Sequence, residues 1–322
     1  MSDKPIILVS KCLGFSNCRY NGQGSKDDFI ELLKDYIEYI TVCPEVEIGL
    51  GIPRETIRLV EVKGEVKVIQ SKNNYDFSEK MNSFNKSFLE KLESIRLDGV
   101  ILKSRSPSCG VKDVKVYADN TKGCSFKKGV GFFAREVIDK YEYYPIEDNG
   151  RLKDYKLREL FLTKLFVSFE LKNVLENYSY DSLLKFHDKN TLLFTMYNKS
   201  RFQILDSLLH KLKEDPEDKE ELVKEYLKNT YRVFNRAARK DNKFNVLSFL
   251  NDRYKERVKN EEYQFIENCI NKYKMGHLPF SSPLGVLKEL SIRFNDEYII
   301  NQSIFSPFPE SLVNVRDSGK VI

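Results

Sequence analysis

The sequence predicts an α/β N-terminal domain, with a mostly parallel sheet flanked by helices, followed by a mainly α-helical C-terminal domain. Over residues 1–150, short apolar runs bounded by turn residues alternate with amphipathic helical patterns. After the polar segment Glu147–Gly150, glycine becomes rare and charged helical periodicity continues to about Lys274. A length of 322 residues is enough for two domains. We therefore place a first domain at 1–150 and a second at 151–322.

Three short apolar runs predict buried parallel strands, at Ile6–Val9, Tyr39–Val42 and Gly99–Leu102. Helical spacing between these runs predicts two covering helices, one over Leu32, Leu33, Ile37 and Ile40, and one over Phe84, Phe88, Leu92 and Ile95. A hairpin is expected at Ile57–Gln70, where valines alternate around a Lys-Gly-Glu turn.

Composition excludes several classes of protein. Hydrophobic residues make up 41% of the chain and charged residues 31%, which excludes wholesale disorder, a collagen-like fibre and a polytopic membrane protein. The six cysteines are too sparse for a disulfide scaffold. The four apolar residues Ile6–Val9 are too few for a secretory signal, and no run approaches a membrane span. We expect a cytoplasmic protein without a membrane partner, whose thiols serve metals or catalysis.

Three cysteines follow the three predicted strands. Cys12 comes after the first strand, Cys43 directly after the second and Cys109 in the loop after the third. The carboxyl ends of strands in an open α/β sheet meet in one crevice, so these thiols are expected to converge. Each could instead be a small buried apolar residue. Zinc is disfavoured because the chain has no CxxC knuckle, whereas an iron–sulfur cluster suits soft thiolates without knuckles. A fourth thiol could come from Cys18 or Cys124.

Two sets of motifs carry family resemblances. The first set, over about residues 5–145, resembles the thiouracil desulfidase family (domain of unknown function 523) through Ser10–Gly14, Cys18–Gly22, Cys43–Glu45, Gly49–Arg54, Lys103–Gly110 and Gly129–Arg135. The second set resembles a domain family of unknown function (1722) through Phe186–His187, Asn245–Leu247, Tyr273–Pro279, Pro283–Leu284 and Pro307–Pro309. The fusion of the two is similar to bacterial tRNA 4-thiouridine desulfidases.

The resemblance implies a cofactor and a reaction. It implies a [4Fe–4S] cluster with three cysteine ligands, which map to Cys12, Cys43 and Cys109, and one open iron that takes the substrate sulfur. Cys18 is not carried over as a ligand. Replacing C=S by C=O needs water and no net electron transfer, and an open iron would act as a thiophilic Lewis acid. The glycines form neither a GxGxxG nor a P-loop pattern, so no nucleotide cofactor is expected.

Glu45 and Ser106 are the candidate catalytic residues. Glu45, two residues after Cys43, would act as general acid/base, or else it is a surface carboxylate. Ser106 would hold the pyrimidine or stabilise charge, and Ser108 is a weaker candidate with an alternative role as a turn residue. Three cations could meet phosphate or a pyrimidine oxygen, or could be solvated loop charges: Lys103, Arg105 and Arg54.

The helical half carries the excess of positive charge. Residues 1–150 contain 23 basic and 23 acidic residues, so the net charge of +5 lies beyond them. A predicted helix from about Glu221 to Lys240 carries a basic stripe of candidate tRNA-binding residues: Lys224, Lys228, Arg232, Arg236, Arg239 and Lys240. The alternative is a solvated face balanced by acids such as Glu221 and Glu225.

The leading hypothesis is an iron–sulfur-dependent, non-redox desulfidase that converts 4-thiouridine in tRNA to uridine and sulfide. A thionucleotide inside folded RNA would give the second domain a purpose, and the base would have to leave its stack to react. Two alternatives stay open: a desulfidase of free thiouracil or thionucleosides, and a non-catalytic iron–sulfur regulator that binds nucleic acid. The sequence carries no indication of oligomeric state.

Overall fold

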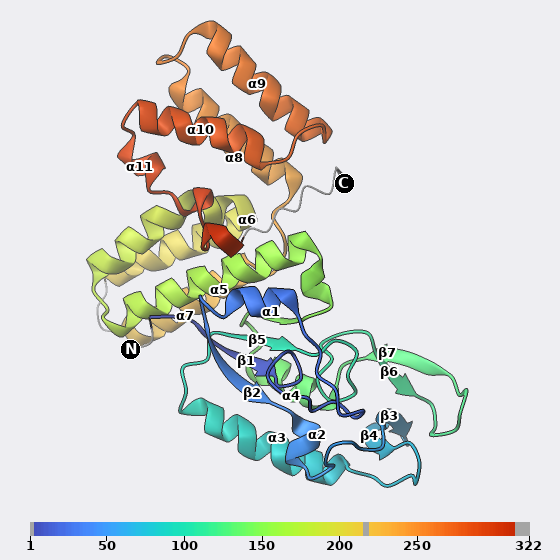
Figure 1. The fold of residues 1–322 in the computed structure, drawn as a ribbon. Helices are drawn as coiled ribbons and strands as arrows, with labels where there is room; N and C mark the ends of the chain where they lie inside the picture. The colour runs from blue at the N-terminus through green and yellow to red at the C-terminus, as the bar shows by residue number, and fades with distance from the viewer. Residues whose placement is uncertain (1–2, 215–218, 313–322) are drawn as a thin grey trace. The chain divides into compact units, whose positions relative to one another are not determined.

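The computed structural model describes residues 3–214 and 219–312. The chain forms two compact units, Met1–Phe161 and Leu162–Ile322, which divide inside helix α5 (Tyr155–Glu176). The first unit contains two sheets with flanking helices and the second consists of helices (Figure 1), which confirms the predicted fold class. The domain limits 1–150 and 151–322 stay a prediction.

Sheet A in the first unit is fully parallel. Its order is β2 (Glu38–Val42), β1 (Ile6–Ser10), β5 (Gly99–Leu102) and β8 (Ile146–Asp148). Leu8 of the central strand pairs with Ile40 on one side and Val100 on the other. The three predicted strands are therefore confirmed, and the short strand β8 is an addition. Strand β5 is buried at every residue, as expected for a parallel sheet covered on both faces.

Helices cover both faces of sheet A. Helix α1 (Asp28–Leu33) lies on one side, and α3 (Ser78–Glu93) lies on the other together with α4 (Phe132–Lys140) (Figure 1). The side chain of Asp27 caps α1 by accepting the N–H groups of Phe29 and Ile30. The helical pattern predicted as far as Ile40 is wrong beyond Leu33, because Ile40 pairs with β1 as part of strand β2.

Sheet B is a second, mixed sheet. Its order is β4 (Glu65–Gln70), β3 (Ile57–Val62), β6 (Val114–Tyr117) and β7 (Phe126–Gly129). The predicted hairpin is confirmed: β3 and β4 are antiparallel, and the turn residues Lys63 and Gly64 have φ values of 52° and 84°. The parallel pairing of β3 with β6 was not predicted. Met81 of α3 and Phe132 of α4 pack against this sheet.

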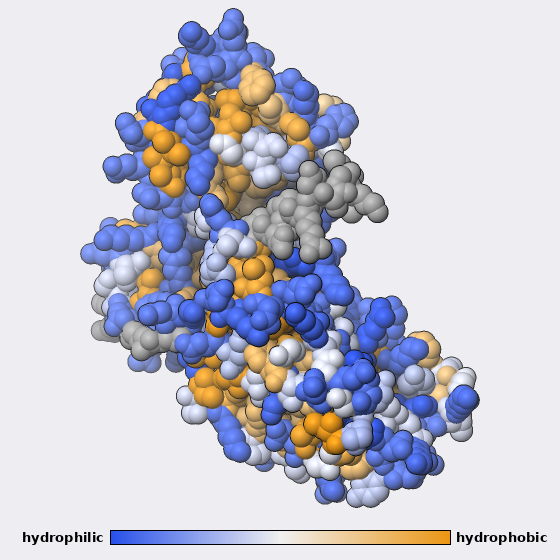
Figure 2. Space-filling model, viewed as in Figure 1, coloured by the Kyte–Doolittle hydropathy of each residue, from blue (hydrophilic) through white to orange (hydrophobic). Residues whose placement is uncertain are grey.

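The second unit is built from helices, of which the last is a single short turn: α6 (Tyr180–Glu214), α7 (Lys219–Val233), α8 (Lys240–Tyr254), α9 (Asn260–Met275), α10 (Ser281–Arg293) and α11 (Glu297–Ile300). Three 3-10 turns flank the helices within the described residues. The turns lie at Arg151–Lys153, before α5, and at Ser303–Phe305 and Glu310–Leu312. Helix α6 breaks at Asn198, whose side chain accepts the N–H of Arg201 at 3.1 Å and caps the second half. Figure 2 shows hydrophobic residues among hydrophilic ones over these helices, where Phe249, Phe265 and Ile292 are exposed.

The predicted helix from Glu221 to Lys240 is wrong in its second half. Helix α7 ends at Val233, and α8 begins at Lys240 after a turn. Phe234 is buried, with its ring centroid 4.9 Å from that of Tyr197 and 5.9 Å from that of Phe194. This packing turns the chain inward and overrides local helix propensity, so the predicted basic stripe is not continuous.

Lys164, on α5, is a buried lysine that is only 8% exposed, and burial lowers its pKa to about 8. No helix in the described part of the chain is long and apolar enough to span a membrane.

Candidate functional site

Three buried thiols follow neighbouring strands of sheet A. Cys12 lies in the loop after β1, Cys43 directly after β2 and Cys109 in the loop after β5. Because β1 lies between β2 and β5, the three loops leave the same edge of the sheet at adjacent positions. The residues are 9%, 8% and 5% exposed. We refer to Cys12, Cys43 and Cys109 as the thiol trio.

The thiol trio is electrostatically linked. Burial raises the pKa of Cys12 to about 11 and that of Cys43 to about 12. Burial also raises the pKa of Cys109, and the nearby Cys12 and Cys43 raise it further. Without a bound cation, the trio is therefore held as neutral thiols. A metal would have to displace these protons, which makes metal binding favoured by higher pH.

The thiol trio suits an iron–sulfur cluster by the chemistry of its donors. Thiolates are soft ligands, which iron–sulfur clusters and zinc both take. The trio supplies three of them, all buried. The described residues contain no preassembled group of three or more His, Cys, Asp or Glu side chains that could hold a metal ion.

Cys18 is a fourth buried thiol beside the trio. It is 2% exposed, and its carbonyl oxygen lies 3.8 Å from Cys43 Sγ. Burial is the main cause of the raised pKa of Cys12, and the nearby Cys18 is the next. Cys18 also raises the pKa of Cys43. Cys124 is half-exposed and donates its Sγ–H to the carbonyl of Asp119 instead. Cys18 therefore adjoins the candidate site, whereas Cys124 does not share these contacts.

Glu45 is fixed next to the trio by a short helix. Cys43 is the N-cap of α2 (Pro44–Glu47) and Pro44 occupies the first helical position, where its missing N–H is not needed. Glu45 follows at once, and its side chain is 13% exposed. Arg54 donates to one carboxylate oxygen, Glu45 Oε2, through Nε at 3.0 Å and Nη2 at 2.7 Å. Both bonds end on the same oxygen, so the second carboxylate oxygen, Oε1, is left for another partner.

The remaining nitrogen of Arg54 is also engaged. Nη1 donates to the carbonyl oxygens of Cys18 at 2.9 Å and of Gly51 at 3.1 Å, and the side chain is 4% exposed. All three guanidinium nitrogens thus contact the protein. The role of Arg54 as a substrate-binding cation stays a prediction, but the contacts shown place Arg54 as a group that positions Glu45.

Two serines connect Glu45 to the loop of Cys109. Ser108 Oγ donates to the second carboxylate oxygen, Glu45 Oε1, at 2.7 Å. Ser106 Oγ lies 3.0 Å from Ser108 Oγ and accepts the backbone N–H groups of Ser108 and Cys109. The sequence favoured Ser106 for catalysis and Ser108 as a turn residue. In the structure, Ser106 stabilises the turn and Ser108 contacts the carboxylate.

Hydrogen bonds from the start of helix α4 hold the loop of Cys109. The N–H of Phe132 donates to the carbonyl of Pro107, and those of Phe133 and Ala134 donate to the carbonyl of Ser108. Gly131 allows this approach, since a Cβ there would stand 2.5 Å from the Ser108 oxygen. Helix amides that otherwise lack partners therefore hold the loop.

Two cations act on Cys12 through their charge. Lys103 and Arg19 both lower the pKa of Cys12, although burial outweighs them. The backbone N–H of Lys103 donates to Ser10 Oγ at 2.9 Å, which ties the loop after β5 to the end of β1. Arg105 is exposed and has a φ of 57°. Sequence reasoning missed Arg19, although its place directly after Cys18 could have indicated it.

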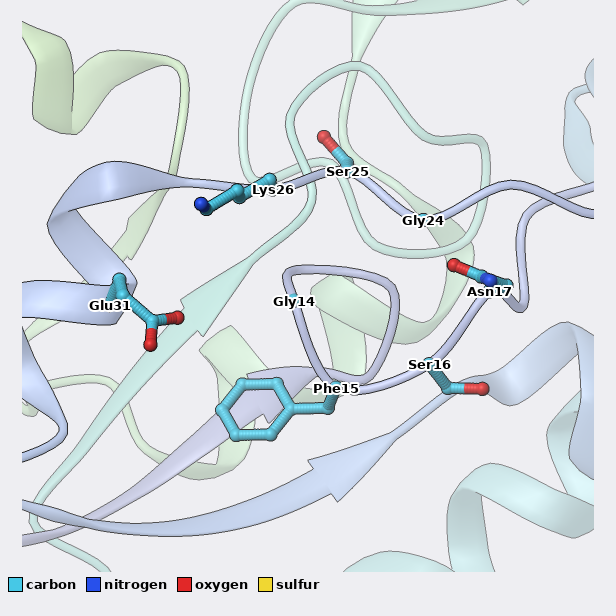
Figure 3. A pocket seen from close by; sticks show the side chains of 8 residues that line it. All are labelled: Gly14, Phe15, Ser16, Asn17, Gly24, Ser25, Lys26 and Glu31. Atoms are coloured by element: carbon cyan, nitrogen blue, oxygen red, sulfur yellow. The ribbon is translucent and has the colours of Figure 1, made fainter.

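A pocket of about 560 Å³ adjoins the loop of Cys12 (Figure 3). Its lining comes from the two sides of that loop and from α1: Gly14, Phe15, Ser16, Asn17, Gly24, Ser25, Lys26 and Glu31. The N–H of Ser25 donates to the carbonyl of Cys12 at 2.8 Å, which closes the loop. One lining residue, Ser25, therefore contacts the backbone of Cys12, although no member of the trio lines the pocket.

The predicted tRNA-binding residues fall on three successive segments. Lys224, Lys228 and Arg232 lie on α7, whereas Arg236 and Arg239 lie in the following turn. The sixth, Lys240, begins α8. Their roles in binding stay predictions.

The first unit is an α/β domain with a thiol-based site and a fixed carboxylate at the carboxyl edge of a parallel sheet. Residues 7–149 match the family model of 2-thiouracil desulfurase, and the chain belongs to this family. Residues 191–309 match the model of a protein of unknown function (DUF1722).

Two relatives are similar to part of the chain. The uncharacterized protein YbbK of Bacillus subtilis (strain 168) is 34% identical over 111 residues, covering 33% of this chain and 73% of YbbK. A solved structure, the [4Fe-4S]-dependent thiouracil desulfidase TudS, is 24% identical with a TM-score of 0.38, covering 47% of this chain and 94% of that one.

Proposed function

We propose that this protein is an iron–sulfur-dependent desulfidase that replaces the sulfur of a thiolated pyrimidine by oxygen. Membership of the 2-thiouracil desulfurase family supports the reaction class. The observation that carries the proposal is the convergence of the thiol trio beside Glu45, at the edge where three parallel strands end. Cys12, Cys43 and Cys109 would hold the cluster, leaving one iron without a ligand from the trio.

The residues around the cluster would transfer a proton and position the group that accepts it. The net reaction adds water to the ring carbon and releases sulfide, so the thiocarbonyl becomes a carbonyl without electron transfer. When bound, the cluster supplies a thiophilic Lewis acid for the departing sulfur. Beyond the two bonds it accepts from Arg54 and the one from Ser108, Glu45 has one lone pair left, and with it takes a proton from the attacking water. Ser108 and Arg54 hold the carboxylate in place for that transfer.

The finer part of the proposal names the substrate as 4-thiouridine within tRNA. A second unit with an excess of basic residues supports it, since a free base would not need such a unit. The competing substrate is free thiouracil or a small thionucleoside, which the family match accommodates equally well.

The test uses the full chain, reconstituted with iron and sulfide without oxygen. We expect about four irons per chain. We also expect release of sulfide from bulk tRNA that contains 4-thiouridine, with loss of that nucleoside on digestion. Release from free 4-thiouracil but not from tRNA would select the free-base alternative. Full cluster loading with no sulfide released from either substrate would overturn the proposal.

Glu45→Gln separates the enzyme from a non-catalytic regulator. The variant keeps the size of the side chain and all three members of the trio, so its iron content should match that of the unaltered chain. Sulfide release should fall by about 10² to 10⁴, the usual contribution of a general base. Unchanged sulfide release would remove Glu45 from the mechanism.

A further inference from the structure

Three ionisable side chains of the second unit meet on helix α6. Nε2 of His187 lies 3.7 Å from Oδ1 of Asp206, and Nε2 of His210 lies 4.0 Å from Oδ2 of the same carboxylate. The side chain of His187 is 4% exposed, whereas those of Asp206 and His210 are 51% and 72% exposed. One carboxylate thus stands between a buried imidazole and an imidazole that faces solvent. We call these three residues the His-Asp-His cluster.

The break in α6 brings the cluster together. In an unbroken helix, His187 and Asp206 would be about 28 Å apart along the axis. Asn198, between them, has φ and ψ of −159° and 92°, and the second part of α6 returns beside the first. Phe202, Asp206 and His210 follow one another at steps of four and share a face of that second part. The rings of Phe202 and His187 stack with centroids 5.2 Å apart, so this face is turned toward His187.

A buried tyrosine fixes the inner ring of the cluster. The hydroxyl of Tyr226, on α7, lies 3.0 Å from Nδ1 of His187. Burial lowers the pKa of His187, although Asp206 and Asp188 oppose this effect, so the ring is neutral at pH 7 and has a lone pair to share. With its proton on Nδ1, the ring donates to Tyr226 and turns the lone pair of Nε2 toward Asp206. Metal-ligating histidines have this arrangement, in which the second ring nitrogen donates to an oxygen of the protein.

The gaps within the cluster are too long for hydrogen bonds and are close to those between metal ligands. An N–H···O bond spans about 2.7–3.2 Å, which is less than the 3.7 and 4.0 Å observed. Donor atoms on neighbouring corners of a tetrahedral zinc site lie about 3.4 Å apart, so closure needs shifts of about half an ångström. The cluster is therefore not preassembled as a metal site in the described residues, but the exposed side chains of Asp206 and His210 can turn toward an ion.

We infer that the His-Asp-His cluster is a binding site for one divalent transition metal ion, distinct from the thiol trio. Two imidazole nitrogens and a carboxylate oxygen are ligands that zinc and iron(II) both take, and water completes the coordination on the exposed side. The bound ion ties the two parts of α6 to each other, and the contact of His187 with Tyr226 extends this tie to α7. The inference does not depend on the proposed function.

The test measures zinc binding to the full chain, because a site that takes iron(II) takes zinc at least as tightly. The chain is first loaded with its iron–sulfur cluster, which occupies the thiol trio. It is then dialysed without oxygen against a series of buffered Zn²⁺ concentrations at neutral pH, and elemental analysis counts zinc and iron per chain. The variants are Asp206→Asn and His210→Gln, which leave the buried His187 in place.

The third histidine of the chain provides a matched control. His277, in the turn after α9, is exposed, and His277→Gln makes the same substitution outside the cluster. Circular dichroism checks that each variant is folded. If the chain takes up no iron, the iron–sulfur part of the proposed function has failed, yet the difference in bound zinc between His210→Gln and His277→Gln still reports on the His-Asp-His cluster.

We expect about one zinc per chain for the unaltered and His277→Gln proteins. Loss of a metal ligand should weaken binding at least as much as loss of a partner behind a ligand, so the Kd for zinc should rise at least about tenfold in Asp206→Asn and His210→Gln. Zinc should raise the thermal midpoint of the unaltered and control chains more than that of these two variants. An unaltered chain that retains no zinc overturns the inference, as does zinc bound equally tightly by His210→Gln and His277→Gln.

Discussion

Replacing Arg54 by lysine tests how Glu45 is positioned. Arg54 donates twice to Glu45 Oε2, at 3.0 and 2.7 Å, and lysine can retain only one such bond from a point charge. A hydrogen bond to a charged group is worth about 1.5–3 kcal/mol. If that free energy holds the carboxylate in its reactive position, its loss lowers kcat by about ten- to a hundredfold.

The assay is sulfide release from 4-thiouracil or 4-thiouridine tRNA by chains with equal iron content. The single variants Arg54→Lys and Glu45→Gln are compared with the double variant. If Arg54 acts only by positioning Glu45, the double variant is no slower than Glu45→Gln alone. Losses that multiply in the double variant would refute this reasoning, because they would show that Arg54 contacts the substrate itself.

Three further predictions concern the thiol trio, the two serines beside Glu45 and the buried Lys164. Serine in place of any member of the thiol trio should abolish cluster loading, whereas Cys124→Ser should leave the iron content unchanged, as measured by iron analysis. Ser108→Ala removes the bond to Glu45 Oε1 and should lower kcat about tenfold or more, while Ser106→Ala leaves two N–H groups without an acceptor and should mainly lower the thermal midpoint. Lys164→Met should raise stability by about 3 kcal/mol at pH 7, because the folded pKa near 8 is below the ordinary value of 10.5. The free-energy cost of burying the charged lysine is present in full below pH 8 and disappears as the pH approaches 10.5. Thermal melts of the two chains should therefore converge near that pH. A difference in thermal midpoint that stays constant with pH would contradict the prediction.

Strands that are buried along their whole length could be predicted from sequence. Gly99–Leu102 appears with the predicted bounds, because four apolar residues between turns are best buried in a parallel strand that is covered on both faces. Strand β7 has the sequence Phe-Lys-Lys-Gly and is mostly exposed, so no hydrophobic pattern marks it. The end of α7 was missed for a related reason. Phe234 leaves the helix to pack on Tyr197, a residue far away in the sequence.

The candidate site shows the same division. The position of the thiol trio could be predicted because all three loops follow strands whose order the α/β pattern constrains. The contact between Ser108 and Glu45 spans 63 residues and depends on how two loops face each other. The two bonds from Arg54 to Glu45 depend on a turn that also places the guanidinium against the carbonyl of Cys18. Residue types alone carried no information on which of two serines would reach the carboxylate.

The way α4 holds the loop of Cys109 bears on how the protein acquires and loses its metal. The amides of Phe132, Phe133 and Ala134 donate to backbone carbonyls of this loop, so none of these three bonds depends on bound iron. Cluster assembly would then need little refolding of this part of the polypeptide. Loss of the cluster to oxidants would leave these three bonds in place, so the loop could take up iron and sulfide again.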